Sequence, residues 1–261
     1  MQFPRLQVHY AWVIIGLSVL LYLGGGSITQ AFGVVILPLQ DEYGWGQGSI
    51  TLAYGISAII SAVLSPVIGT ATDKYGGRPV LFVGVVCFFI GTAMSAMATE
   101  VWHIWISYGL FLGVTQSCLN VALITTATYW FREKLGVGVG LLQCAQGVGP
   151  AGTTLLIGIL LAHYDWRVAF WSLGIGGGAA MAMIVFFFRS KPSDMGLDPL
   201  GGAWSGAVGQ EFSREIRMVR DKARAASIQS TSAFWKLVLV HYLGCVSHAI
   251  VIVYIIPIAV L

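Results

Sequence analysis

Charged residues are scarce in this sequence, since Asp, Glu, Lys and Arg together make up 10% of its 261 residues. A soluble domain has about 25% charged residues, so a soluble chain of this size would lack the charge to cover its surface. Disordered segments are rich in charge and poor in apolar residues, whereas 57% of these residues are hydrophobic. The net charge of +3 is too small to indicate a nucleic-acid partner. The composition therefore predicts a membrane protein with several spans.

Paired cysteines and catalytic patterns are also missing. Each of the four cysteines lies inside an apolar run, and no two have metal-ligand spacing: Cys87, Cys118, Cys144 and Cys245. We therefore expect the cysteines to be small packing residues without a disulfide. Because there is also no glycine-rich phosphate loop and no nucleophile–base pattern, the sequence predicts no enzyme, no metal site and no cofactor.

Long apolar runs are abundant instead. A membrane-spanning helix needs about 20 apolar residues, and seven windows reach that length: residues 10–38, 48–70, 79–99, 101–126, 136–162, 166–188 and 234–260. The runs are continuous rather than alternating, which favours helices over a β-barrel. The sequence thus predicts an all-α fold, a polytopic membrane helix bundle.

The positive charges lie on one side of the predicted spans. All but one of the 14 Lys and Arg residues precede the first span, lie between spans 2 and 3 or spans 4 and 5, or follow span 6. The other side holds the exception, Arg167, together with Asp41, Glu42, Glu100 and Asp165. Because an excess of Lys and Arg marks the cytoplasmic face, we expect a cytoplasmic N-terminus. The expected location is a plasma membrane or a bacterial inner membrane.

The predicted spans divide the chain into three segments. Residues 1–188 hold the first six spans, residues 189–233 form a polar connector, and residues 234–261 hold the seventh span. In the connector, one face of a short amphipathic helix collects the apolar residues Phe212, Ile216, Val219 and Ala223. This helix is expected to lie on lipid headgroups or on the protein, with a cytoplasmic partner as the alternative. Six spans before a long loop and one span after it indicate a partial chain.

The most specific motif is the segment from Gly69 to Val80, "GTATDKYGGRPV", between spans 2 and 3. Pro79 suits the first turn of a helix, and the neighbouring glycines allow a tight reversal of the chain. Asp73, Lys74 and Arg78 can form a compact charge cluster at the membrane edge. From these residues alone, a gate for one side of a transporter and a simple positively charged turn are equally supported.

This segment resembles the signature loop between helices 2 and 3 of the major facilitator superfamily. The matching residues are Gly69, Asp73, Lys74, Gly76 and Arg78, and Gly77 stands at a position that is usually basic. Further segments resemble the family in the same order: 129–149 "YWFREKLGVGVGLLQCAQGVG", 165–174 "DWRVAFWSLG", 189–201 "RSKPSDMGLDPLG" and 230–237 "STSAFWKL". The chain is most similar to the monocarboxylate-porter and oxalate/formate-antiporter-like branches.

The resemblance implies a six-helix N-terminal bundle, followed by a seventh span that begins a second bundle. It also implies a secondary transporter, a symporter or antiporter, that moves a small organic anion such as a mono- or dicarboxylate by alternating access. The missing C-terminal bundle or a second copy would complete the pathway. Two alternatives are a dimerising half-transporter, and a membrane sensor or scaffold that binds a partner through residues 189–233 without transport.

Neutral polar residues are the candidates for the solute cavity. No Asp, Glu, Lys or Arg lies deep in the first six spans, where a buried charge would cost about 2.5–3.5 kcal/mol. The candidates on spans 1, 4 and 5 are Tyr22, Thr29, Gln30, Gln116, Asn120, Gln143 and Gln146. The alternative for each is a hydrogen bond between helices. On span 7, His241 and His248 share a face and are candidates for a proton-linked role.

Overall fold

The computed structural model describes residues 9–26, 32–201, 227, 230–237, 239–240, 243–244 and 247. The chain divides into two compact units, Met1–Gly202 and Ala203–Leu261. In the second unit, residues 232–237 are helical, and so are the described residues beyond them. Most of the predicted connector and of the seventh span lies outside the described residues.

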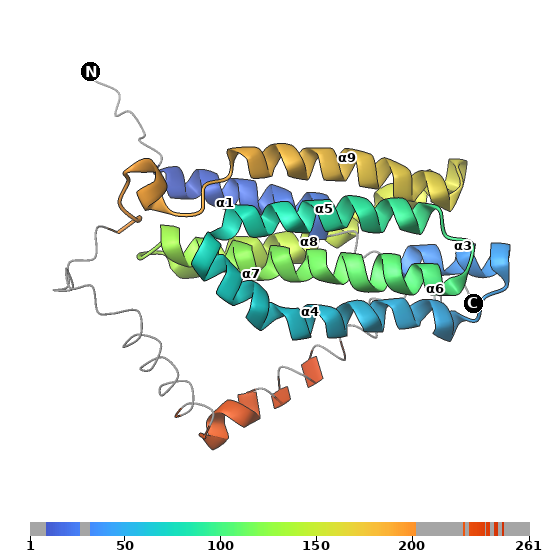
Figure 1. Cartoon of the computed structure of the whole chain (residues 1–261), viewed down its shortest axis with the longest axis horizontal. Coiled ribbons are helices and arrows are strands. Elements are labelled where there is room, and N and C mark those ends of the chain that lie inside the picture. Colours follow the sequence, from blue (N-terminus) through green and yellow to red (C-terminus); the bar gives the residue numbers. More distant parts are fainter. Residues whose placement is uncertain are drawn as a thin grey trace. The chain divides into compact units, whose positions relative to one another are not determined.

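The first unit is helical throughout its described length (Figure 1). Its elements are α1 (Tyr10–Leu21), η1 (Tyr22–Gly26), α3 (Gly33–Tyr43), α4 (Gln47–Tyr75), α5 (Gly77–Ala96), α6 (Val101–Ile104), η2 (Trp105–Leu112), α7 (Gly113–Trp130), α8 (Leu135–His163), α9 (Trp166–Phe187) and η3 (Pro192–Met195). The elements η1 and η2 are π-helical, and η3 is a 3₁₀ turn. Among these residues the β contacts amount to one isolated bridge, Phe131–Leu200. The predicted all-α fold is confirmed.

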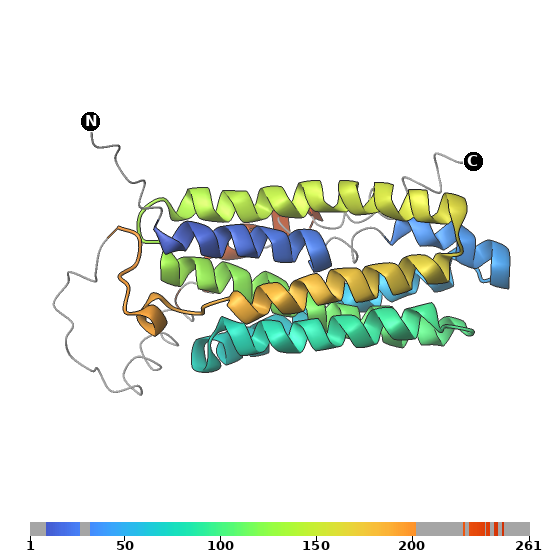
Figure 2. The same cartoon turned by 90° about the horizontal axis from the view of Figure 1, so that it is seen from above.

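The long helices run side by side in a bundle (Figures 1 and 2). Helix α7 packs between α4 and α5, and α5 also packs against α9. Helix α8 contacts α1 and η1. Helix α4 bends in its second half (Figure 1), the half that contains Pro66, and a proline inside a helix is a common cause of such a bend.

Small residues let several of these helices approach closely. A Cβ atom built at Gly113 would lie 2.9 Å from the Ser57 carbonyl oxygen of α4, and one at Gly109 would lie 2.8 Å from Ile56. Larger residues at these two positions would force the helices apart. At Gly136 and Gly140, which have the same four-residue spacing, a Cβ would meet nothing within 4 Å. That second pair therefore does not mark a helix contact within the described structure.

Predicted spans 2 to 6 are found, the first span is divided, and most of the seventh lies outside the described residues. Five stretches in the described part are long and apolar enough to cross a membrane: Gln47–Tyr75, Gly77–Ala96, Val101–Trp130, Leu135–His163 and Trp166–Phe187. The window 10–38, expected as one helix, instead holds α1, η1 and the start of α3, with residues 27–31 outside the described residues. Helix α3 continues to Tyr43 and ends at Gly44, which has a left-handed φ of +66°.

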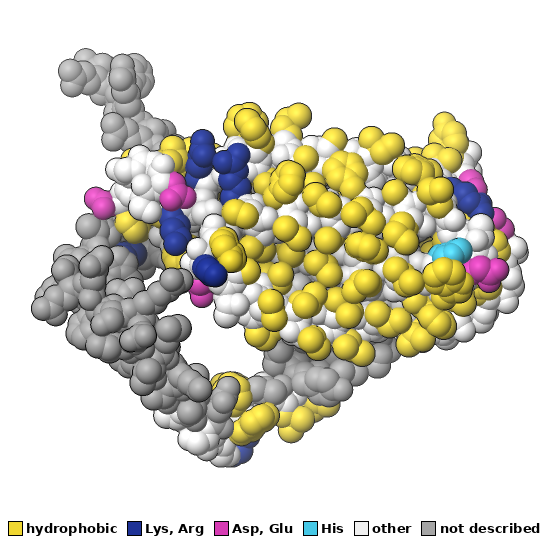
Figure 3. All heavy atoms as spheres, viewed as in Figure 1, with side chains coloured by type: hydrophobic (Ala, Val, Ile, Leu, Met, Phe, Trp, Pro, Cys, Tyr) yellow, Lys and Arg dark blue, Asp and Glu magenta, His cyan; other side chains and the backbone are white. Residues whose placement is uncertain are grey.

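On the face seen in Figure 3, hydrophobic side chains gather along the length of the bundle and charged side chains gather at its ends. The turns α4–α5 and α7–α8 and the segment after α9 form the basic end, and the turns α3–α4 and α8–α9 form the acidic end. In the most apolar part of α4 only 11% of the residues are buried, against 56% in Val101–Trp130. A helix with this much exposed apolar surface needs lipid or another helix around it. The chain is therefore an integral membrane protein with several spans.

Candidate functional site

The signature loop lies at the basic end, where Asp73 belongs to the last turn of α4. Its Oδ1 accepts a hydrogen bond of 2.7 Å from the Tyr129 hydroxyl of α7. The Lys191 Nζ lies 5.4 Å from the centre of the Tyr129 ring, a cation–π contact from the segment after α9. The carboxylate is thus connected through Tyr129 to two other parts of the bundle.

Arg78 contacts a different partner, the end of α9. Its guanidinium donates to the carbonyl oxygen of Val185 at 3.3 Å and to that of Phe186 at 2.8 Å, and its backbone N–H donates to Ser190 Oγ at 2.9 Å. A positive charge bonded to the last carbonyls of a helix stabilises that helix end.

The compact charge cluster expected in this loop therefore takes another form. Asp73 lies on α4 and bonds α7, whereas Arg78, the second residue of α5, bonds the end of α9. Within the described residues the ion pairs all lie elsewhere, and none joins these two side chains. Lys74 is exposed, with its Nζ 4.9 Å from the centre of the Tyr75 ring.

Two glycines of the loop that match the signature pattern, Gly69 and Gly76, differ in their surroundings. Gly76 has φ +90°, and a Cβ there would lie 2.9 Å from Ser190 Oγ. Gly69 lies in regular helix, and a Cβ there would make an ordinary contact of 3.8 Å with Val121. Only Gly76 is therefore required by the backbone and by the space available.

The segment after α9 joins the turns of the basic end. The Trp130 Nε1 donates to the Arg189 carbonyl oxygen at 3.2 Å, and the Leu200 N–H donates to the Trp130 carbonyl oxygen at 2.9 Å. The Leu200 carbonyl oxygen in turn accepts from the N–H groups of Arg132 and Glu133, at 3.0 and 3.1 Å. The start of the predicted connector is thus held against the α7–α8 turn.

Three of the predicted cavity residues meet in one polar cluster. The Tyr22 hydroxyl of η1 donates to Asn120 Oδ1 of α7 at 3.0 Å, and Gln146 Nε2 of α8 donates to the same oxygen at 2.5 Å. Asn120 is the twentieth of 30 residues in the stretch 101–130, and Gln146 is the twelfth of 29 in α8, so both lie near the middle of their spans. We call Tyr22, Asn120 and Gln146 the central polar cluster.

The other predicted residues lie near this cluster or outside the described part of the chain. Gln116 lies one turn before Asn120 and is half-buried, and Gln143 lies one turn before Gln146 and is exposed. Thr29, Gln30, His241 and His248 lie outside the described residues. The contact among Tyr22, Asn120 and Gln146 comes from the structure, and the role of these residues in a solute cavity stays a prediction.

A second cluster, at the acidic end, was not predicted as a site. Arg167, at the start of α9, donates to Glu42 Oε1 at 2.8 Å and to Asp165 Oδ2 at 3.0 Å. The Trp166 Nε1 donates to Glu42 Oε2 at 2.5 Å, and Arg167 also bonds the Tyr43 hydroxyl. The hydrogen bond from Arg167, and after it the one from Trp166, hold the pKa of the Glu42 carboxyl below its usual value. In the sequence, Arg167 is the one basic residue among the acidic residues of this end, and this isolated positive charge could have indicated the ion pair.

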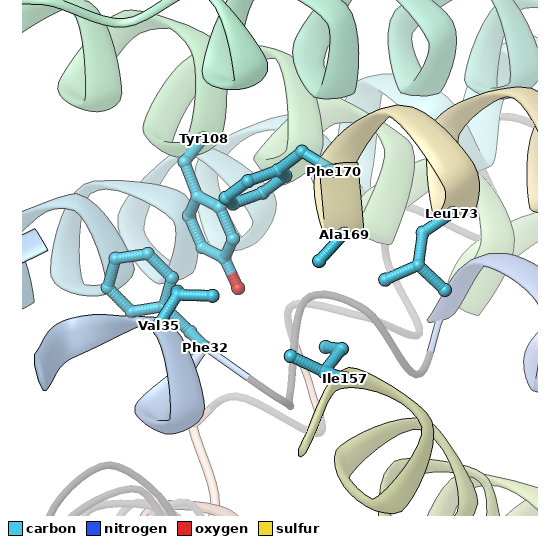
Figure 4. A pocket seen from close by; sticks show the side chains of 7 residues that line it. All are labelled: Phe32, Val35, Tyr108, Ile157, Ala169, Phe170 and Leu173. Atoms are coloured by element: carbon cyan, nitrogen blue, oxygen red, sulfur yellow. The ribbon is translucent and has the colours of Figure 1, made fainter. Parts of the chain in front are cut away.

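An apolar cleft lies among α3, η2, α8 and α9 (Figure 4). Its lining residues are Phe32, Val35, Tyr108, Ile157, Ala169, Phe170 and Leu173. The rings of Phe32 and Tyr108 form one wall, with their centres 4.1 Å apart. The cleft contains no member of the central polar cluster, so it is a separate apolar feature.

Among the described residues, no group of three or more His, Cys, Asp and Glu side chains is placed to hold a metal ion.

The model of the Major Facilitator Superfamily matches residues 14–261 of the chain. The chain belongs to this family. The Major Facilitator Superfamily comprises transporters rather than enzymes, which confirms the prediction that this chain is not an enzyme. The predicted similarity to monocarboxylate porters is also confirmed, because the curated relatives include distant matches to monocarboxylate transporters.

One of these relatives is a human protein and another is an avian protein. "Monocarboxylate transporter 14" of Homo sapiens is 22% identical over 196 residues, which are 75% of this chain and 38% of that protein. "Monocarboxylate transporter 9" of Gallus gallus is 28% identical over 141 residues, which are 54% of this chain and 28% of that protein. The chain thus spans well under half the length of these curated relatives.

A solved structure of the same superfamily has a similar fold. The "proton:xylose symporter XylE bound to 6-bromo-6-deoxy-D-glucose" matches with a TM-score of 0.59 and 15% sequence identity. The match covers 70% of this chain and 46% of XylE. At this identity the similarity establishes the fold, and the solute of this chain is a separate question.

Proposed function

We propose that this chain supplies one six-helix bundle of a secondary transporter that moves a small organic anion, a mono- or dicarboxylate, by alternating access. The observation that carries the proposal is the central polar cluster. It places a hydroxyl and two amides near mid-span in a bundle whose charged side chains lie at its ends. Polar groups at membrane depth are costly and mark solute pathways, and in transporters with repeated bundles the solute site lies near the midplane.

The organic-anion class is supported by the relatives, several of which are named monocarboxylate transporters. Hydroxyl and amide hydrogens are suitable donors for a carboxylate. The second wall of the pathway comes from a further bundle, either a C-terminal bundle or a second copy. The largely exposed helix α4, with 11% of its apolar window buried, is suited to face such a bundle.

The signature loop is proposed to gate the basic side, which we place in the cytoplasm together with the N-terminus. Its Asp73–Tyr129 hydrogen bond connects α4 to α7 at the surface, where a neighbouring bundle would close. Replacing Asp73 with Asn keeps the size of the side chain and removes the charge. We expect the transport rate of Asp73→Asn to fall more than its amount in the membrane. An unchanged rate per molecule would remove the gating role.

Uptake of labelled solutes tests the transport proposal. The protein, expressed from its complete reading frame, is reconstituted in liposomes, and entry of radiolabelled lactate, pyruvate and succinate is compared with entry into empty liposomes. Asn120→Leu, which keeps the volume and removes the amide, is the test variant. Loss of its hydrogen bonds should lower uptake about tenfold at equal protein content. Absence of uptake of all three anions by the unaltered protein, or equal uptake by Asn120→Leu, would contradict the proposal.

A further inference from the structure

The central polar cluster is asymmetric in its hydrogen bonding. Two cross-helix bonds of the cluster end on one atom, Asn120 Oδ1, which accepts from the Tyr22 hydroxyl and from Gln146 Nε2. An amide oxygen has two lone pairs, so these two donors saturate it. They come from two elements far apart in the sequence, η1 at the end of the first helix and α8, which contact each other.

The amide nitrogen of Asn120 is left as a donor. Within the described residues it donates no hydrogen bond, and the only buried polar side-chain atom there without a partner is Thr126 Oγ1. The Asn120 nitrogen, in a half-buried side chain, therefore keeps accessible surface. Because the amide group is planar and its oxygen is fixed by two bonds, its two N–H groups point away from Tyr22 and Gln146.

We infer that Tyr22 and Gln146 are positioning residues, which hold the Asn120 amide so that its N–H₂ group faces the solute and selects a group that only accepts hydrogen bonds. This inference rests on the proposed function and adds the chemical reason for a preference among solutes. A carboxylate accepts at both oxygens, whereas the N–H₂ end of a carboxamide would face the Asn120 donors. Rejection of a group that leaves buried donors unpaired is a strong source of specificity.

The π-helical turn η1 is part of this arrangement. It follows α1 directly and contains Tyr22 and three glycines, "YLGGG". A Cβ at Gly25 would lie within 2.5 Å of the Met181 side chain, and one at Gly177 of α9 would lie 2.9 Å from the Gly24 carbonyl oxygen. The turn therefore packs directly on α9, and π-helical turns of this kind are common at functional sites. This packing fixes the backbone from which Tyr22 reaches Asn120.

Tyr22→Phe tests the inference, because it removes one hydroxyl and keeps the ring. With one anchor lost, the Asn120 amide can rotate and present its oxygen. The protein in liposomes is assayed with the best-transported carboxylate of lactate, pyruvate and succinate, with its primary amide as a competitor. We expect the KM for the carboxylate to rise about threefold to tenfold, the range for one hydrogen bond. Inhibition by the amide, measured relative to this KM, should increase.

Two further variants make the result specific. Tyr10→Phe removes a hydroxyl from the first turn of α1, where the ring packs on Trp130 with centres 5.4 Å apart, and should leave both values unchanged. Gln146→Glu replaces the N–H₂ donor by a carboxylate of the same size, and should change KM and selectivity in the same direction as Tyr22→Phe. It also provides the test if Tyr22→Phe does not reach the membrane.

The outcomes separate this inference from the proposed function. If the unaltered protein transports none of the carboxylates, the proposed function fails. If it transports them while Tyr22→Phe and Gln146→Glu keep the same KM and the same ratio of carboxylate to amide, the positioning role is overturned and transport stands. A loss of maximal rate without a change in that ratio would also overturn it, because a merely structural defect lowers the amount of active protein without altering selectivity.

Discussion

At the scale of single residues, different side-chain interactions join the helices at the two ends of the bundle. The basic end uses Arg78 on helix carbonyls and the Asp73–Tyr129 bond. The acidic end uses the Glu42–Arg167 ion pair, with side chains 37% and 33% exposed. Exposed ion pairs contribute little to stability, but Glu42 also accepts from the Trp166 indole. This additional bond ties α3, the second part of the first span, to the start of α9.

The Glu42 cluster predicts a dependence of stability on pH. Because the pKa of Glu42 is lowered in the folded protein, the folded state binds fewer protons than the unfolded state between the two pKa values. The stabilisation is fully present above the ordinary carboxyl pKa of about 4.3, and it is lost as the pH falls through the lowered value. We expect Glu42→Gln to lower the free energy of unfolding at pH 7 by ~1 kcal/mol or less.

Thermal unfolding of the purified protein in detergent measures this effect. The difference in Tm between the unaltered protein and Glu42→Gln should be largest near neutral pH and should shrink below about pH 4. Asp41→Asn is the matched control, since Asp41 is the exposed neighbour and has no ion pair within the described structure. An equal effect of both variants would mean that general charge, and not the Arg167 contact, is responsible.

At the scale of elements, the backbone of the α4–α5 turn requires a glycine at position 76. Gly76 combines φ +90° and ψ +165° with the close approach of Ser190. Side chains other than glycine are strained in this region by about 1–3 kcal/mol. We expect Gly76→Ala to lower the free energy of unfolding by about that amount, as measured by thermal unfolding and by the yield of monodisperse protein.

Gly69→Ala is the comparison within the same motif. Gly69 is helical, and its Cβ would have room, so alanine there should leave stability unchanged or raise it by up to ~1 kcal/mol. If Gly69→Ala proved as damaging as Gly76→Ala, the role assigned to the turn geometry would be wrong. A reduced transport rate with normal stability would instead place Gly69 in the moving part of the loop.

The sequence predicted the elements well where the signal is local. Apolar length and flanking charge located the helices, so the predicted window 79–99 corresponds to α5 at Gly77–Ala96. The division of the first span was missed, because the run around Gly24 is apolar throughout and nothing in its hydropathy marks a π-helical turn. The central polar cluster was predicted as a set of candidates, but the common acceptor, Asn120 Oδ1, depends on how three helices pack. Hydrogen bonds between residues 124 positions apart, such as Trp166 to Glu42, have no local signal.

At the scale of the whole molecule, the distribution of charge predicts the orientation in the membrane. On the face seen in Figure 3, hydrophobic side chains cover much of the bundle between its ends, so we expect the basic and acidic ends to face opposite compartments. Lys and Arg are retained on the cytoplasmic side during insertion. The α3–α4 turn, which follows Asp41 and Glu42, should therefore lie outside, and the α4–α5 turn with Lys74 should lie in the cytoplasm.

Labelling of single cysteines measures this orientation. In a variant whose four native cysteines are replaced, Asp41→Cys should react with a membrane-impermeant maleimide in intact cells, and Lys74→Cys only after the membrane is permeabilised. Both positions are exposed at helix ends, so access does not depend on the solute pathway. Helix α4 alone separates the two positions by one crossing, since it runs from Gln47 to Tyr75. Reaction of both variants from the same side would therefore show that α4 does not cross the bilayer, and the bundle could not line a path between two compartments.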